Sequence, residues 1–165
     1  MLAWNLASCQ STPRQVAPVP ESEQVIRESM KDLYMAASAA PPQSREQQRV
    51  ILKMADQAAN GKELLLVMRA AVGVFPAGAA GEKQLHSKVA AKMMELATLE
   101  QLTDYATEYP VSPESARPFV ERMFQLGDQN ADPRLWSRIR LAAFHLQVKD
   151  LEQQAQARVN QLAGR

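Results

Sequence analysis

With 165 residues, the chain is long enough for one domain with a single hydrophobic core. Its 19 basic and 18 acidic residues give a formal net charge of +1, which argues against a general nucleic-acid binder, since such proteins are usually strongly basic. No apolar run reaches the roughly 18 residues of a transmembrane helix. Aromatic content is only 5%, and good helix formers are abundant, which favours an all-α protein with a mostly aliphatic core.

Residues 1–20 differ in composition from the rest of the chain. After Cys9 they are rich in Gln, Ser, Thr and Pro, and Pro13, Pro18 and Pro20 remove backbone donors and favour extended backbone. We therefore predict a flexible tether over residues 1–20 and a single helical domain over residues 21–165. Because Cys9 is the only cysteine, the chain has neither an internal disulfide nor a cysteine-based zinc site.

The segment Leu6-Ala7-Ser8-Cys9 resembles the lipobox of bacterial lipoproteins. In that family an apolar residue and two small residues precede a cysteine, which is lipidated on its thiol and becomes the mature N-terminus. The resemblance covers only about the first 20 residues, including the polar tether behind the cysteine. It implies a lipid anchor on Cys9, with the domain held away from the bilayer by the tether.

Two features qualify the meaning of this resemblance. Eight residues precede Cys9 and none is Lys or Arg, whereas a signal peptide has a basic region and an apolar stretch of about 7–15 residues. Either the native start lies upstream of Met1, or the segment is a disordered cytosolic tail with an incidental cysteine. Lipoproteins kept in the inner membrane carry an aspartate after the cysteine, so Gln10 implies the periplasmic face of the outer membrane.

Apolar periodicity and capping signals predict seven or eight helices in the domain and no sheet. We expect Asn60-Gly61 to end the second helix, because glycine accepts the left-handed conformation that follows a helix. Asp150 is expected to be the N-cap of the last helix. In chain order the predicted helices are Glu21–Ala40, Ser44 to Asn60-Gly61, Glu63–Val72, Glu82–Leu96, Leu99–Tyr109, Ser112 or Ser115 to Leu126-Gly127, Asp132–Val148, and Asp150 to Ala163-Gly164.

One internal similarity has a constant offset of 52 residues, since Val89–Gln101 matches Leu141–Gln153. Each copy predicts a helix, a tight turn and a second helix. Stacked helical hairpins of this kind build α-solenoids. The turn resembles that of tetratricopeptide repeats, although the Trp, Gly, Tyr and Pro positions of that family do not line up, and capping rules alone could produce the match. The predicted architecture is therefore stacked antiparallel hairpins, forming either a short α-solenoid or an irregular bundle.

The sequence contains no recognisable catalytic or cofactor motif. Its two histidines, His86 and His145, lie on separate predicted helices without Cys, Asp or Glu at metal-ligand spacing. The glycines from Gly73 to Gly81 lack the strand and the Lys-Ser/Thr ending of a phosphate-binding loop. We therefore predict a non-enzymatic protein that has neither a cofactor nor a metal site.

A basic stripe on the seventh predicted helix and its end is the best candidate for a binding surface. Arg134, Arg138, His145 and Lys149 lie within about 60° of one another on a helical wheel. They either contact an acidic protein, a phosphate backbone or anionic headgroups, or simply form the solvated face of an amphipathic helix. We expect both arginines to project into solvent, so that reversing either charge costs within about 0.5 kcal/mol.

The predicted function is a non-enzymatic protein-interaction module. With an anchor on Cys9 it would be a periplasmic accessory lipoprotein of a bacterial envelope machine for secretion, conjugation or wall remodelling. Its partner would be another envelope protein, and no nucleic-acid partner is expected. The alternative is a cytosolic helical adaptor or inhibitor with a disordered N-terminal tail.

Overall fold

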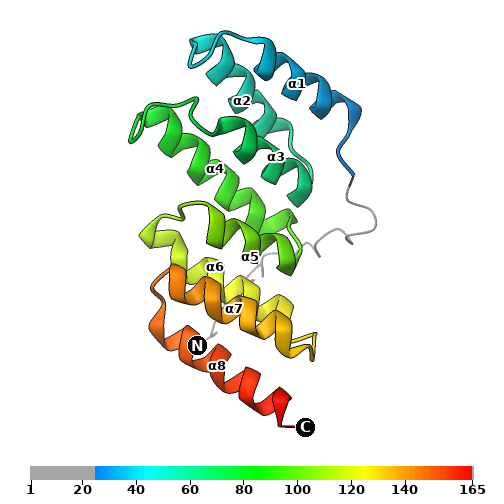
Figure 1. Ribbon diagram of the computed structural model, residues 1–165, viewed down its shortest axis with the longest axis vertical. Helices are drawn as coiled ribbons and strands as arrows, with labels where there is room; N and C mark the ends of the chain where they lie inside the picture. The colour runs from blue at the N-terminus through cyan, green and yellow to red at the C-terminus, as the bar shows by residue number, and fades with distance from the viewer. Residues whose placement is uncertain (1–24, 165) are drawn as a thin grey trace, which may run out of the picture.

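The computed structural model describes residues 25–164, and this part of the chain folds into eight helices without a strand (Figure 1). The predicted all-α fold class is therefore confirmed. The helices are α1 (Glu28–Ala39), α2 (Arg45–Gln57), α3 (Gly61–Ala71), α4 (Ala80–Leu96), α5 (Leu99–Glu108), α6 (Pro113–Gly127), α7 (Pro133–His145) and α8 (Lys149–Ala163).

The helices form an elongated stack of antiparallel hairpins, as predicted (Figure 1). Helices α1, α3, α5 and α7 contact one another in sequence and form one layer, while α2, α4 and α6 form the second layer. The loops from α3 to α4, α5 to α6 and α7 to α8 lie along one edge, on the left in Figure 1, and the turns into α3, α5 and α7 lie along the opposite edge. The odd-numbered helices begin at residues 28, 61, 99 and 133, a spacing typical of two-helix repeats.

The 52-residue similarity does not coincide with this structural repeat. It relates the α4–α5 turn to the α7–α8 turn, which lie on opposite edges of the stack. The first turn has a capping box of Thr98 and Gln101, whereas the second passes through Gln147 in a left-handed conformation (φ 60°). The prediction that Asp150 is the N-cap of the last helix was wrong, because Val148 occupies the N-cap position and Asp150 is the second residue of α8.

The prediction that Asn60-Gly61 ends the second helix was also wrong. Helix α2 already ends at Gln57, and the Asn60 side chain accepts a hydrogen bond from the Glu63 backbone N–H as the N-cap of α3. Gly61 is the first residue of α3, and a Cβ atom there would lie 2.0 Å from Oε1 of Gln101. The position requires glycine because α5 approaches closely, a contact that the local sequence does not reveal.

The core is mostly aliphatic, as the composition indicated, with methionines among its largest buried side chains. A few aromatic side chains lie within it: Tyr105 packs on Phe119 with ring centroids 5.6 Å apart, and Trp136 packs edge-on against Phe124 at 5.1 Å. Because the apolar residues continue from one hairpin to the next, a single core runs along most of the stack.

One carboxylate is fully buried in this core. Glu63, in the first turn of α3, accepts hydrogen bonds from the backbone N–H and Nε of Arg27 at 3.0 and 2.9 Å. Its second oxygen accepts from Nη2 of Arg27 at 2.8 Å and from the backbone N–H of Ala59 at 2.9 Å. Arg27 is consequently extended, which is why α1 begins at Glu28 rather than at the predicted Glu21.

Burial alone raises the pKa of Glu63, but the hydrogen bonds from Arg27 and Ala59 outweigh it and hold the pKa below its ordinary value. A carboxyl group whose folded-state pKa is lowered contributes its stability above the unfolded pKa, about 4.3 for Glu, and loses it as the pH falls through the folded value. The contact therefore predicts a loss of stability in acid.

We predict that Glu63→Gln lowers the free energy of unfolding by about 2–3 kcal/mol, because the donors of Arg27 and Ala59 lose the charge of a buried acceptor. Between pH 6 and pH 3, the free energy of unfolding should fall less steeply for the variant than for the wild type. Urea titrations at several pH values measure both effects.

Glu28→Gln is the matched control, since Glu28 is an exposed carboxylate paired with Lys31 in the first turn of α1. It should cost within about 0.5 kcal/mol. Equal losses from the two variants would contradict the central role of Glu63.

Candidate functional site

The structure separates the four residues of the predicted basic stripe. Arg134 is exposed in the first turn of α7 and forms no ion pair within the described residues. His145 is exposed at the other end of the same helix, about 16 Å away at 1.5 Å per residue. Lys149 is exposed at the start of α8. Cys9 lies outside the described residues.

Arg138 has a structural contact instead of projecting into solvent. Its Nη1 contacts Oε1 of Glu100 at 2.6 Å, its Nη2 contacts the carboxylate of Asp104, and its side chain is 33% exposed. Burial lowers the pKa of Arg138, but the two carboxylates raise it by more. The prediction that Arg138 projects into solvent was therefore wrong. Its positive charge is neutralised by α5, which a helical wheel of α7 alone does not show.

A chain of hollows runs along the loop edge of the stack, and we call it the loop-edge furrow. It passes the α3–α4, α5–α6 and α7–α8 loops, and its largest hollow has a volume of about 760 Å³. Neighbouring hollows share lining residues, so they follow one another along this edge. The shared residues, from α4 to α8, are Glu82, His86, Tyr109, Pro110, Val111, Pro113, Ala116, Leu146, Gln147 and Lys149.

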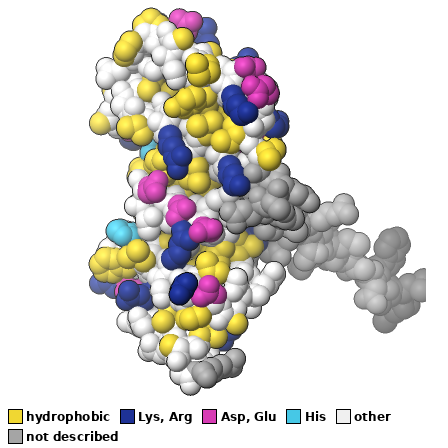
Figure 2. Space-filling model, turned by 45° about the vertical axis from the view of Figure 1, so that its right-hand side comes forward, with side chains coloured by type: hydrophobic (Ala, Val, Ile, Leu, Met, Phe, Trp, Pro, Cys, Tyr) yellow, Lys and Arg dark blue, Asp and Glu magenta, His cyan; other side chains and the backbone are white. Residues whose placement is uncertain are grey.

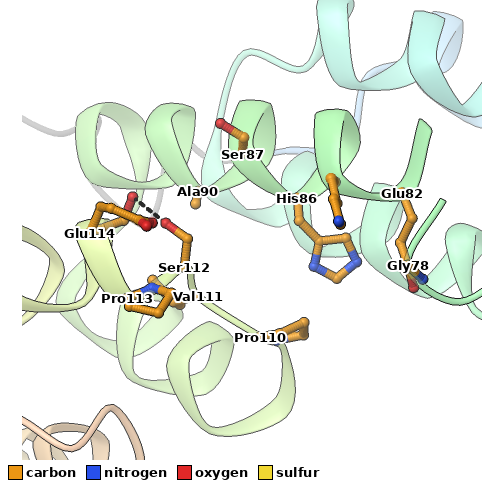
Figure 3. A pocket seen from close by; sticks show the side chains of 12 residues that line it. Gly78, Glu82, His86, Ser87, Ala90, Pro110, Val111, Ser112, Pro113 and Glu114 are labelled. Carbon is orange, nitrogen blue, oxygen red and sulfur yellow. Dashed lines mark hydrogen bonds between the residues drawn. The ribbon is translucent and has the colours of Figure 1, made fainter. Parts of the chain in front are cut away.

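The largest hollow lies between α4 and the start of α6 (Figure 3). The ring of His86 projects from α4 into the space that Pro110 borders on the other side. The Nδ1 atom of His86 is buried and has no hydrogen-bond partner within the described residues. At the start of α6 the Ser112 hydroxyl bonds the Ser115 hydroxyl at 3.0 Å rather than a backbone N–H. This hollow therefore combines an apolar wall with polar groups that face the opening.

Two exposed hydrophobic side chains border the furrow. Val72, directly after α3, is 74% exposed, and Phe144, in the last turn of α7, is 53% exposed. The Phe144 ring contacts His145 edge-on, with centroids 5.9 Å apart. Both histidines of the chain therefore lie at the furrow. These two side chains lie near opposite ends of the furrow, Val72 at the α3–α4 loop and Phe144 at the α7–α8 loop.

The helical periodicity of the sequence indicated His145 and Lys149 but not the apolar residues of this surface. Phe144 was detectable in principle, because it lies away from the apolar stripe that α7 buries through Ile139 and Ala143. The hollow itself depends on how neighbouring hairpins stack, so no local pattern predicts it. Elsewhere the surface mixes both signs of charge with hydrophobic side chains, as the face in Figure 2 shows.

Comparisons with known proteins do not identify this arrangement: neither a protein-family model, a curated protein nor a solved structure matches the chain. Within residues 25–164, none of the helices has the length and apolar character needed to cross a membrane. The same residues contain no group of three or more His, Asp or Glu side chains arranged to hold a metal ion.

We predict that the two arginines of α7 differ in their effect on stability. Arg138→Glu should lower the free energy of unfolding by about 1–2 kcal/mol, because it loses two carboxylate contacts and gains repulsion from them. Arg134→Glu should change it by no more than about 0.5 kcal/mol, since this side chain is exposed at a helix N-terminus, where acidic residues are favourable. Urea denaturation measures both values.

A charge swap tests the cause of this difference. Combining Arg138→Glu with Glu100→Arg should restore part of the lost stability, and high salt should narrow the gap between the single variants. Equal stabilities of Arg134→Glu and Arg138→Glu would show that the contacts with α5 contribute little.

Proposed function

We propose that the chain is a non-enzymatic protein-interaction module whose partner binds in the loop-edge furrow. The observation that carries this proposal is the row of adjoining hollows from α3 to α8, with the exposed side chains of Val72 and Phe144 near its two ends. A stack of helical hairpins suits such a role, because each added hairpin lengthens a binding surface without changing its neighbours.

We further propose that a lipid on Cys9 tethers this module to the periplasmic face of the outer membrane, as an accessory lipoprotein of an envelope machine. The lipobox-like segment Leu6-Ala7-Ser8-Cys9 and the Pro-rich stretch behind it support this part of the proposal. Confinement to a surface raises the effective concentration of any partner held at the same surface.

The entry point of the described chain is compatible with both parts of the proposal. The carbonyl oxygen of Val25 accepts a hydrogen bond from the Asn60 side chain at 2.9 Å, so the chain enters the fold beside the α2–α3 turn. This turn lies on the edge opposite the furrow (Figure 1). The segment that leads back to Cys9 is therefore attached on the far side of the stack from the furrow.

We predict that the native gene product carries acyl chains on Cys9 and that Cys9→Ser releases it from membranes. Metabolic labelling with a fatty-acid analogue, followed by membrane fractionation, measures both effects. An unlabelled wild-type protein would refute the lipid anchor and favour the cytosolic adaptor. It would not bear on the furrow, which the variants and crosslinks at residues 144 and 141 test.

We predict that Phe144→Asp weakens binding of the physiological partner at least about tenfold, since buried aromatic anchors typically carry more than 1 kcal/mol of binding energy. Leu141→Asp is the matched control, because Leu141 is a 44% exposed hydrophobic residue one turn earlier on α7 and does not line the furrow.

A photo-crosslinking amino acid placed at residue 144 or residue 141 tests the same point in native extract. Crosslinks to one discrete protein should form from residue 144 and not from residue 141. Equal crosslinking from both positions, or equal affinities of the two variants, would remove the furrow as the binding surface.

A further inference from the structure

We infer that the loop-edge furrow binds an extended, basic segment of a partner protein, with apolar side chains between its cations. The inference rests on the proposed function, because it names the chemistry of the partner at that same surface. It follows from the charges of the side chains that line the furrow, from the carboxylates at the helix N-termini beside it, and from its length.

Acidic side chains outnumber basic ones along the furrow. Five carboxylates line it, namely Glu82, Glu108, Glu114, Asp150 and Glu152. Only three Lys or Arg side chains do so, namely Lys83, Arg117 and Lys149. Arg117 and Asp150 pair with each other, with Nη2 2.7 Å from Oδ1, which leaves four carboxylates and two lysines. With neutral histidines the furrow is therefore net negative, although the whole chain carries a formal charge of +1.

The helix ends at the furrow do not reverse this sign. Helices α4, α6 and α8 all begin at this edge, and a helix N-terminus by itself favours an anion. Each of these three ends, however, has an acidic residue of its own in its first turn. Glu82 accepts a hydrogen bond from the Gly78 backbone N–H at 2.5 Å, at the start of α4.

The other two helix ends follow the same pattern. The pKa of Glu114 is lowered first by its own backbone N–H and then by the Ser112 hydroxyl. The pKa of Asp150 is lowered first by Arg117, with further contributions from its own backbone N–H and that of Leu151. The positive ends of α6 and α8 are thus matched by carboxylates from within the chain, and these carboxylates stay ionised at neutral pH.

The shape of the furrow requires an extended occupant. It passes the starts of α4, α6 and α8, and packed helices lie about 8–10 Å apart, so these three starts span roughly 16–20 Å. Extended backbone rises about 3.3 Å per residue, so about five or six residues cover this span and a nine-residue peptide reaches beyond both ends. Between the charges the wall is apolar, with Pro110, Val111 and Leu146 along it. Alternating cationic and apolar side chains match both features.

The test uses three nine-residue peptides of Val and Pro that carry three Lys, three Glu or three Ser residues at the same positions. Binding to ¹⁵N-labelled protein is followed by amide chemical-shift changes during titration at low salt. We expect the Lys peptide to bind most tightly, to shift amides of the α5–α6 and α7–α8 loops, and to lose affinity as salt rises.

Charge reversal at two matched positions makes the test specific for the furrow. Glu108 is the last residue of α5 and lines the furrow, whereas Glu95 is the penultimate residue of α4 and lies at the opposite edge. Both are exposed, and both changes to Lys add the same charge near a helix C-terminus. Glu108→Lys should weaken the Lys peptide about fivefold, while Glu95→Lys should leave its affinity within about a factor of two.

Several results would overturn the inference. Tighter binding of the Glu peptide at the furrow would show that the partner segment is acidic rather than basic. The furrow would then remain a binding surface, but the inference about its partner would be wrong. Equal losses of Lys-peptide affinity from Glu108→Lys and Glu95→Lys would show that the peptide responds to the net charge of the protein and not to the furrow. Absence of chemical-shift changes with the Lys peptide at millimolar concentration would also overturn the inference of a basic partner segment. The crosslinking experiment at residue 144 tests the proposed function independently.

Discussion

The buried carboxylate of Glu63 is the contact on which the first half of the fold depends. Its four hydrogen bonds join the start of α1, the turn between α2 and α3, and the first turn of α3 itself. A buried carboxylate is stable only when its charge and lone pairs are matched, and here two backbone N–H groups and one guanidinium match them. Because the guanidinium of Arg27 also donates to the Gln57 carbonyl at the end of α2, one ion pair positions three helices.

Similar charged contacts recur between hairpins along the stack. Lys88 pairs with Asp56 between α4 and α2, while Lys92 donates to the carbonyls of Ala55, Asp56 and Ala58 at the end of α2. Arg122 of α6 donates to the Met94 carbonyl of α4. Arg138 joins α7 to α5, and Arg117 joins α6 to α8. Hydrophobic packing alone is weakly directional, so these contacts fix the register of one hairpin on the next.

This distribution of charge explains which features could be predicted from the sequence. Helix positions followed from local signals, such as the capping box of Thr98 and Gln101, because capping involves residues three or four apart. Arg134 and Arg138 look equivalent on a helical wheel, and only the neighbouring helix α5 distinguishes them. Gly61 likewise looks like a helix stop until Gln101 is placed against it. The furrow escaped prediction for the same reason, since its walls come from hairpins distant in sequence.

The two edges of the stack have different tasks under the proposed function. A tether that joins the fold before Val25 would transmit any load to the contacts of Asn60 and Glu63, which lie in the first two hairpins. The Asn60 contact is a neutral hydrogen bond, whereas those of Glu63 are charge-assisted and therefore stronger. The furrow lies at the other edge and extends to the last hairpin, where α8 covers the end of the core. Force on the tether would therefore reach the loop-edge furrow only across the whole width of the stack. Under the proposed function, anchoring and partner binding are thus placed at opposite edges of one small domain.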